Sequence, residues 1–220
     1  EFSVGGACEV RDGALGLPKH GRSYTDLAGL VRFDRFGLQG EGIAARWGKL
    51  RGTADFALKR FDHPVLRLEA TVSGPTAEYL RFIRPDRALS EVSIEGDSSA
   101  RIVVDGPLDK SPDAVTVLAD ATLTDNTVSF GQDRLEQLAN LNATVKATAG
   151  SVEVRSFDAR WQDEPLTGSG CVRVASSPLI EGVVRLAGTD LQCQMRLQSA
   201  SDPTRFEAAV RATCDVARLL

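Results

Sequence analysis

The segment Val65-Leu-Arg-Leu-Glu-Ala-Thr-Val72 alternates apolar and polar side chains without interruption. Residues 191–198 (Leu-Gln-Cys-Gln-Met-Arg-Leu-Gln), 205–213 and 115–123 repeat this pattern. A period of two is typical of β-strands with one apolar and one polar face. Weaker examples occur at residues 31–36, 53–59, 101–105, 141–148 and 151–157. The chain is therefore predicted to be mainly β, with long antiparallel strands joined as hairpins.

A second pattern is internal repetition. Ala45-Arg46-Trp47 returns as Ala159-Arg160-Trp161, and Leu27-Ala-Gly-Leu30 resembles Leu138-Ala-Asn-Leu141. Leu50-x-Gly52 similarly resembles Leu166-x-Gly168. Repetition at this scale is typical of stacked copies of one supersecondary unit. We expect residues 1–220 to form one continuous body made of two repeats, about 1–113 and 114–220, and to be a fragment of a longer protein.

Proline and glycine predict where the strands are interrupted. Ser73-Gly-Pro75 and the later Pro85 indicate one short helix near 75–84, and a second helical turn is predicted at Gln132–Leu138. Arg81, Arg84 and Arg87 follow a helical spacing that is typical of a solvated face, although contact with lipid headgroups or acidic neighbours is an alternative. Turns are predicted at Asp12-Gly13, Gly40-Glu-Gly42, Asp125-Asn126, Ala149-Gly150, Ser176-Ser-Pro178 and Ser201-Asp-Pro203.

The apolar strand faces need a cover that one short helix cannot provide. A sheet folded onto itself as a sandwich or barrel is one solution. A long twisted antiparallel sheet curled into an open groove, whose apolar side holds a long apolar ligand, is the other. Aromatic residues make up 6% of the chain, which is little bulk for a two-sheet core, so the pattern favours the groove. The candidate lipid-binding residues are Phe56, Leu58, Leu66, Leu68, Val72, Val104, Val117, Val145, Val154, Val172, Leu186, Leu191, Met195, Leu197, Phe206 and Val210.

Other functional classes find little support in the sequence. The formal charge of −4 leaves no basic stripe for nucleic acid. The only two histidines, His20 and His63, lie in polar or turn-like segments, and no nucleophile motif, phosphate-binding loop or metal-ligand spacing is present. We therefore expect no catalytic residues, no metal and no cofactor. The four cysteines, Cys8, Cys171, Cys193 and Cys214, are expected to be buried free thiols, with two disulfides in an oxidising compartment as the alternative.

Several longer phrases support a resemblance to a known family. Residues 121–131 (Ala-Thr-Leu-Thr-Asp-Asn-Thr-Val-Ser-Phe-Gly), 135–145, 152–160 and 166–170 resemble the repeating units of the AsmA-like superfamily of bacterial envelope proteins, which includes TamB and YhdP. The first repeat resembles a more diverged copy, through Asp26-Leu-Ala-Gly-Leu30 and residues 47–52. The resemblance covers most of the chain and carries over no catalytic residue.

The resemblance implies both a fold and a function. It implies a taco-like apolar β-groove in a periplasmic protein that is anchored in the inner membrane by a segment outside this chain. Such a groove carries phospholipid, or another acyl-chain lipid, between membranes, with an outer-membrane or envelope protein as a possible partner. A structural or adhesive β-sandwich without a ligand is the alternative interpretation.

Overall fold

The structure, a computed structural model, is nearly all β. It describes residues 5–17, 22–83, 92–110, 114–130, 136–173, 179–186, 189–199 and 202–214. The strands are β1 (Gly5–Leu17), β2 (Arg22–Asp34), β3 (Gly37–Trp47), β4 (Leu50–Lys59), β5 (Val65–Pro75), β6 (Val92–Pro107), β7 (Thr116–Phe130), β8 (Glu136–Thr148), β9 (Ser151–Trp161), β10 (Glu164–Arg173), β11 (Leu179–Leu186), β12 (Thr189–Ser199) and β13 (Asp202–Cys214). One helix, α1 (Thr76–Ile83), follows β5.

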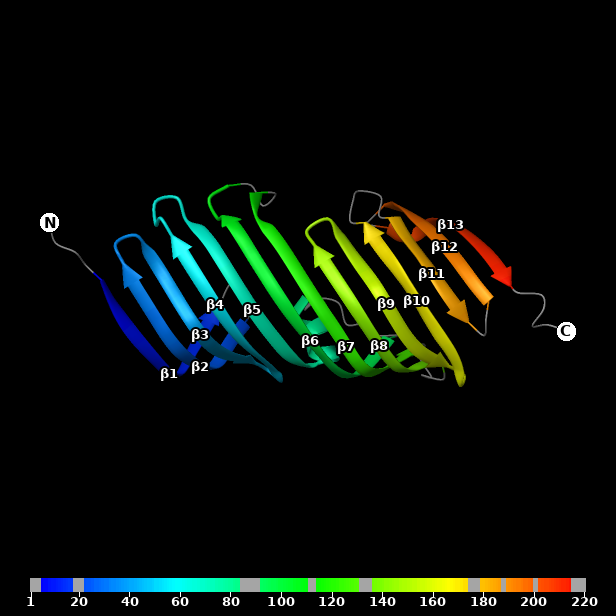
Figure 1. Cartoon of the computed structure of the whole chain (residues 1–220), viewed down its shortest axis with the longest axis horizontal. Helices are drawn as coiled ribbons and strands as arrows, with labels where there is room; N and C mark the ends of the chain where they lie inside the picture. Colours follow the sequence, from blue (N-terminus) through cyan, green and yellow to red (C-terminus); the bar gives the residue numbers. More distant parts are fainter. Residues whose placement is uncertain are drawn as a thin grey trace. The chain divides into compact units, whose positions relative to one another are not determined.

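The strands form a single 13-stranded sheet in which every strand is hydrogen-bonded to its neighbours in sequence (Figure 1). The order runs from β1 to β13 without a crossover, and the sheet is not closed into a barrel. Pairing is antiparallel, as in β4 with β5 and β11 with β12. The predicted mainly β fold with an open sheet is thus confirmed, and the described strands do not form the two packed sheets of a sandwich.

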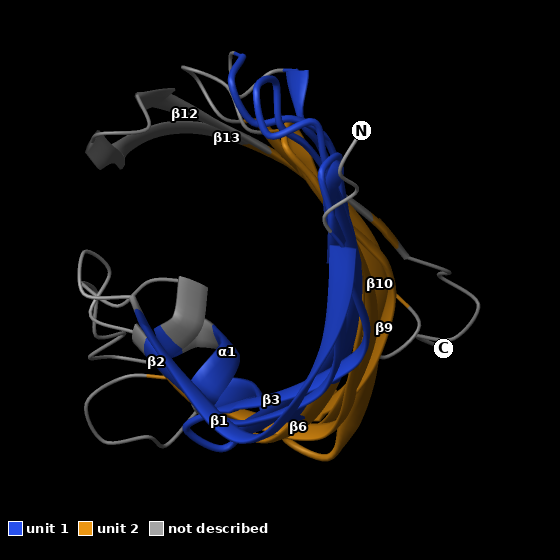
Figure 2. Ribbon diagram, turned by 90° about the vertical axis from the view of Figure 1, so that its left-hand side faces the viewer, with its two compact units in different colours: residues 1–83, 99–119 blue, residues 84–98, 120–220 orange. Residues whose placement is uncertain are grey.

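The chain divides into two compact units. One contains residues 1–83 and 99–119, and the other contains residues 84–98 and 120–220 (Figure 2). The division passes through β6 and β7, because each of these strands contributes residues to both units. That residues 1–220 form one continuous groove made of repeats 1–113 and 114–220 stays a prediction.

The strand pattern repeats with a constant spacing of 114 residues. The starts of β3, β4 and β5 at Gly37, Leu50 and Val65 recur at the starts of β9, β10 and β11. Trp47 ends β3 and Trp161 ends β9, the first strand of each set, and each is followed by a two-residue turn. Since these turns have equal length, Leu50 corresponds in position to Glu164. The sequence match between Leu50 and Leu166 is therefore displaced by two residues.

Three predicted turns are wrong, because their residues lie inside strands. Asp12, Gly42 and Asp125 have left-handed φ angles of 51°, 57° and 52°, and they lie within β1, β3 and β7. The pairing registers of β1 and β3 shift at these positions, which marks β-bulges. A bulge inserts one extra residue, bends the strand and reverses the parity of the side chains beyond it. Apolar residues on both sides of the bulge thereby reach the same face.

Asn126, next to Asp125, is completely buried. Its Nδ2 donates hydrogen bonds to the carbonyl oxygens of Asp97 (3.0 Å) and Thr124 (3.1 Å). Gly96, with φ of 120°, lies against it, and a Cβ atom at Gly96 would lie 2.8 Å from the Asn126 Cγ. This amide therefore joins β6 to β7 at a point where a larger residue at position 96 would not fit.

Helix α1 confirms the helix predicted near 75–84, and it begins directly after Pro75. Arg81 is exposed, as expected of a solvated face, and it also donates a hydrogen bond to an acidic neighbour, Glu78, at 2.9 Å. Arg84 and Arg87 lie outside the described residues. The strands of each unit curve along their length, and α1 lies inside the arc of the first unit (Figure 2). The second helical turn, predicted at 132–138, is wrong for residues 136–138, which belong to β8, and its other residues lie outside the described part.

Candidate functional site

The apolar face of the first unit is defined by strand register. Phe56 lies opposite Leu68, Leu58 opposite Leu66, and Gly52 opposite Val72. Directly paired residues of antiparallel strands point to the same side of the sheet. These side chains therefore form one apolar face, and Asp55, Arg67 and Glu69 lie on the opposite, polar face.

The second unit has an equivalent apolar row that crosses six strands. Val145 pairs with Val154, Val154 with Gly170, and Gly170 with Gly182. The row continues through Cys193 to Val210. Because each step is a direct pairing, all of these residues share one face.

Most candidate lipid-binding residues are half-buried. This group contains Phe56, Leu58, Leu66, Leu68, Val72, Val104, Val145, Val154, Val172, Leu186 and Leu191. Val117 is exposed, and Val210 is 65% exposed. The side chains of Met195, Leu197 and Phe206 lie outside the described part of the structure. An apolar side chain that is half-buried in an ordered strand touches its neighbours in the sheet and still presents one side outward.

The described residues form only a thin core. The apolar residues that are buried are Leu50, Ala100, Val128, Ala143, Ala159 and Leu166. Large apolar side chains such as Phe33 (44%), Trp161 (39%) and Val210 (65%) are exposed. Parts of the apolar face therefore have no cover from the described part of the chain.

Three exposed residues extend the apolar face beyond the candidates. Leu15 and Phe33 lie on it in the first unit, opposite Tyr24 and Leu38. Trp161, which is 39% exposed, lies on it in the second unit, next to Ala159 by alternation. Sequence reasoning missed them because bulges reverse the alternation between them and the recognised segments. Period-two matching that allows one inserted residue at Asp12 would have found Leu15. The insertion that precedes Trp161 lies at Arg155 or Ser156, where no aspartate or glycine marks it.

Phenylalanine rings smooth the apolar face by lying over glycines of neighbouring strands. A Cβ atom at Gly6 would lie 2.9 Å from the ring of Phe33. Gly40 has the same relation to Phe56, and Gly168 to Phe157. A ring above a glycine covers the exposed backbone and leaves a shallow, continuous hydrocarbon surface. Such a surface suits a flexible alkyl chain better than a rigid polar ligand.

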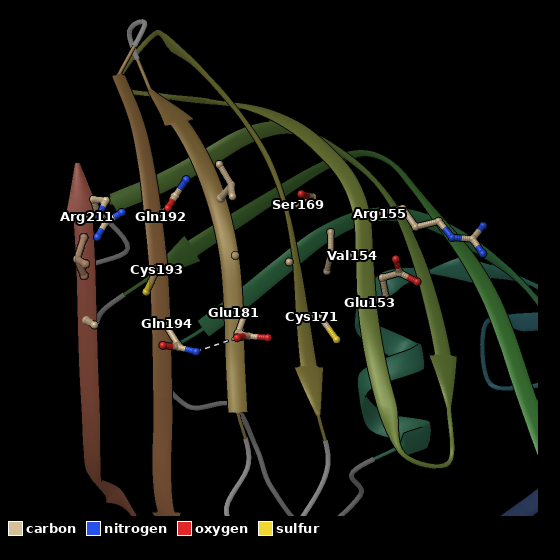
Figure 3. Close-up of a pocket in the computed structure, with 15 residues that line it drawn as sticks. Glu153, Val154, Arg155, Ser169, Cys171, Glu181, Gln192, Cys193, Gln194 and Arg211 are labelled. Carbon is tan, nitrogen blue, oxygen red and sulfur yellow. Dashed lines mark hydrogen bonds between the residues drawn. The ribbon is translucent and has the colours of Figure 1, made fainter. Parts of the chain in front are cut away.

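A shallow hollow of about 740 Å³ crosses β9 to β13 in the second unit (Figure 3). Gly170 and Gly182 contribute backbone to it. Glu181 accepts hydrogen bonds from Gln194 (2.8 Å) and Arg173 (3.2 Å), so its carboxylate is already engaged. In this hollow the structure places no histidine and no acid beside a cysteine sulfur at hydrogen-bonding distance. The lining combines polar side chains with Val154, Cys193 and Val210, which belong to the apolar row.

The cysteines differ from the expected buried thiols. Cys8 is exposed, and Cys171 and Cys193 are half-buried; all three are free. Cys171 pairs with Glu153 and Glu181, so it lies on the polar face. The prediction of burial is wrong for these three residues because an open sheet has no interior to receive them. The side chain of Cys214 lies outside the described residues.

One ion pair connects two loops of the first unit. His63 Nδ1 lies 2.9 Å from Asp109 Oδ2, and the Leu108 amide donates a hydrogen bond to the Pro64 carbonyl at 2.8 Å. The hydrogen bond to Asp109 raises the pKa of His63 above 6.5, and the same bond lowers the pKa of Asp109. Because His63 is largely exposed, we interpret this ion pair as a contact that holds the two loops together. His20 lies outside the described residues.

Within the described ranges, no group of histidine, cysteine or acidic residues is arranged to hold a metal ion. None of the helical structure described has the length and apolarity to span a bilayer. The geometry therefore leaves the two-faced sheet, apolar on one side and charged on the other, as the candidate site. Comparisons with known proteins add no assignment, because the chain matches no family model, no curated protein and no solved structure.

Proposed function

We propose that this chain is a segment of a protein that carries phospholipid, or another acyl-chain lipid, between membranes along the apolar face of its sheet. The observation that carries the proposal is the row of half-buried apolar side chains that the described part of the chain leaves uncovered. Soluble proteins rarely expose apolar patches of more than a few hundred Å² unless something binds there. An alkyl chain is the ligand whose shape and chemistry match a long, shallow hydrocarbon surface.

The expected binding is weak and permissive. Full burial of a methylene group of the lipid contributes about 0.8 kcal/mol to binding. A methylene that touches the protein on one side only therefore contributes roughly 0.4 kcal/mol. About ten methylenes in contact then give about 4 kcal/mol, which corresponds to a dissociation constant of about 1 mM. A lipid held this loosely can move along the face. Few polar groups are placed to select a headgroup, so several phospholipids should be carried.

The polar face supports the same proposal. Arg101 and Glu69 form an ion pair at 2.8 Å, and Arg185 and Asp190 form one at 2.6 Å. These exposed pairs keep the outer side of the sheet hydrated while the apolar side holds lipid. We propose a periplasmic location with an inner-membrane anchor outside this chain. Membranes and an envelope protein are the proposed partners, with no nucleic acid and no enzymatic activity.

Native mass spectrometry of the purified chain tests the proposal. Adducts with the masses of phospholipids are expected, and they should return when delipidated protein is incubated with phospholipid vesicles. A structural module without a ligand would retain no lipid and take up none. Equal uptake of a lipid and of its water-soluble headgroup would also contradict the proposal, because the headgroup has no alkyl chain.

A further inference from the structure

A small apolar cavity lies where α1 packs on the apolar face of the first unit. Its volume is about 140 Å³, and its lining includes Trp47, Leu50, Val72, Tyr79 and Ile102. An apolar cavity of about this size, roughly 150 Å³, stays dry and accepts benzene or xenon. The cavity is thus large enough for the end of a hydrocarbon chain, and its lining is almost entirely apolar.

A hydrogen bond from Tyr79 helps to fix the position of the helix wall. The Tyr79 hydroxyl donates to the carbonyl oxygen of Val72 at 2.6 Å, which ties α1 to β5. Burial raises the pKa of Tyr79 to about 12, so the phenol stays neutral at physiological pH. With its hydroxyl bonded to the backbone of β5, Tyr79 contributes its ring to the lining. The cavity therefore has a fixed wall on the helix side.

The two tryptophans lie in different surroundings in the two repeats, and their fluorescence can report on each repeat separately. Trp47 lines the cavity, and Trp161, 114 residues later at the equivalent strand end, is 39% exposed on the apolar face. They are the only tryptophans in the chain. One therefore reports on the cavity beside α1 and the other on the exposed apolar face.

We propose that the cavity beside α1 is a subsite for the methyl end of one acyl chain, so that lipid on the first unit is held in a defined position. This inference rests on the proposed function. A chain lying along β4 and β5 meets α1 at Val72, and its last carbons enter the cavity against Trp47. The open face near Trp161 has no such end stop among the described residues, so chains there slide.

Brominated lipids test this placement, because bromine quenches tryptophan fluorescence at short range. The variants Trp161→Phe and Trp47→Phe each leave one reporter. Phospholipids carrying bromines near the methyl end, or near the headgroup end, of the acyl chain are the probes. Methyl-end bromines should quench Trp47 several-fold more than headgroup-end bromines. Trp161 should be quenched similarly by both.

Filling the cavity supplies the matched comparison. Ile102→Phe places a larger side chain in the cavity, whereas Thr71→Phe places the same side chain on the polar face of β5, outside the cavity. In the Trp161→Phe background, methyl-end quenching should be lost with Ile102→Phe and retained with Thr71→Phe. If Ile102→Phe does not fold, Val72→Leu adds a smaller volume to the cavity lining. A partial loss of methyl-end quenching of Trp47 is then expected.

The outcomes separate the two proposals. Quenching of Trp161 without quenching of Trp47 would overturn the subsite and leave lipid carriage standing. Equal quenching of Trp47 by both labels, or no effect of filling the cavity, would also overturn the subsite and identify the cavity as a packing void. Absence of quenching at both tryptophans would refute the proposed function itself.

Discussion

A charge placed on the apolar face distinguishes an open lipid surface from a closed core. Leu68 is half-buried and lies opposite Phe56. Full burial of a leucine contributes roughly 1.5–3 kcal/mol, so Leu68→Glu should cost about 1 kcal/mol of unfolding free energy on this half-open face. That cost corresponds to a Tm decrease of about 2–4 °C for a chain of this size. In a closed core the unpaired carboxylate would cost several kcal/mol and prevent folding.

Lipid binding should respond more strongly than folding. The carboxylate removes hydrocarbon contacts and would have to lose water beneath an acyl chain, so lipid occupancy should fall about tenfold or more, equivalent to at least about 1.4 kcal/mol. Circular dichroism melting measures the fold, and native mass spectrometry measures bound lipid. Thr71→Glu adds the same charge on the polar face and should change neither. Collapse of the Leu68→Glu fold, or unchanged lipid occupancy, would refute the reasoning.

Three further predictions concern the sheet and its loops. Asn126→Ala leaves the carbonyl partner on Asp97 without its buried donor and should lower the unfolding free energy by about 1–3 kcal/mol in urea titrations. Because the fold raises the pKa of His63, its stabilising contribution is present below pH 6.5 and fades as pH rises through the folded value; Asp109→Asn should lower the NMR titration midpoint of His63. Gly40→Ala should displace the Phe56 ring and cost about 1–3 kcal/mol, measured by thermal melting.

Each of these predictions has a clear contrary result. A Cβ atom added at Gly16 would have no described atom within 4 Å, so Gly16→Ala is the control for Gly40→Ala and should be nearly neutral. Equal effects of the two alanines would show that ring stacking is not the cause. An unchanged His63 midpoint in Asp109→Asn would mean that the ion pair is not formed in solution. A wild-type urea midpoint in Asn126→Ala would show that its buried hydrogen bonds do not stabilise the sheet.

The sequence predicted the sheet well where the alternation is unbroken. The pattern at 65–72 places Leu66 and Leu68 on one face, as the pairing with β4 confirms. The helix was predictable because Pro75 and the apolar spacing that follows are local signals. The open sheet was favoured by the low aromatic content of the whole chain. This property does not depend on where individual strands and turns are predicted to begin or end.

The bulges and the cysteine environments were not predictable in the same way. An aspartate followed by glycine or asparagine favours a left-handed backbone, and that conformation serves both turns and bulges. Only pairing with the next strand shows that Asp12 lies within β1. Cys171 illustrates the same limit, because its face depends on register across β9 and β11 and not on its own sequence neighbours.

Photo-crosslinking along β5 tests the central claim most directly. A benzophenone amino acid is placed in turn at positions 66, 67, 68, 69 and 70, and each variant is illuminated with phospholipid vesicles. The proposed lipid surface predicts crosslinks to lipid at 66, 68 and 70 and none at 67 and 69, a period of two that matches the face assignment. Crosslinks of equal strength at all five positions, or at none, would contradict lipid carriage on the apolar face.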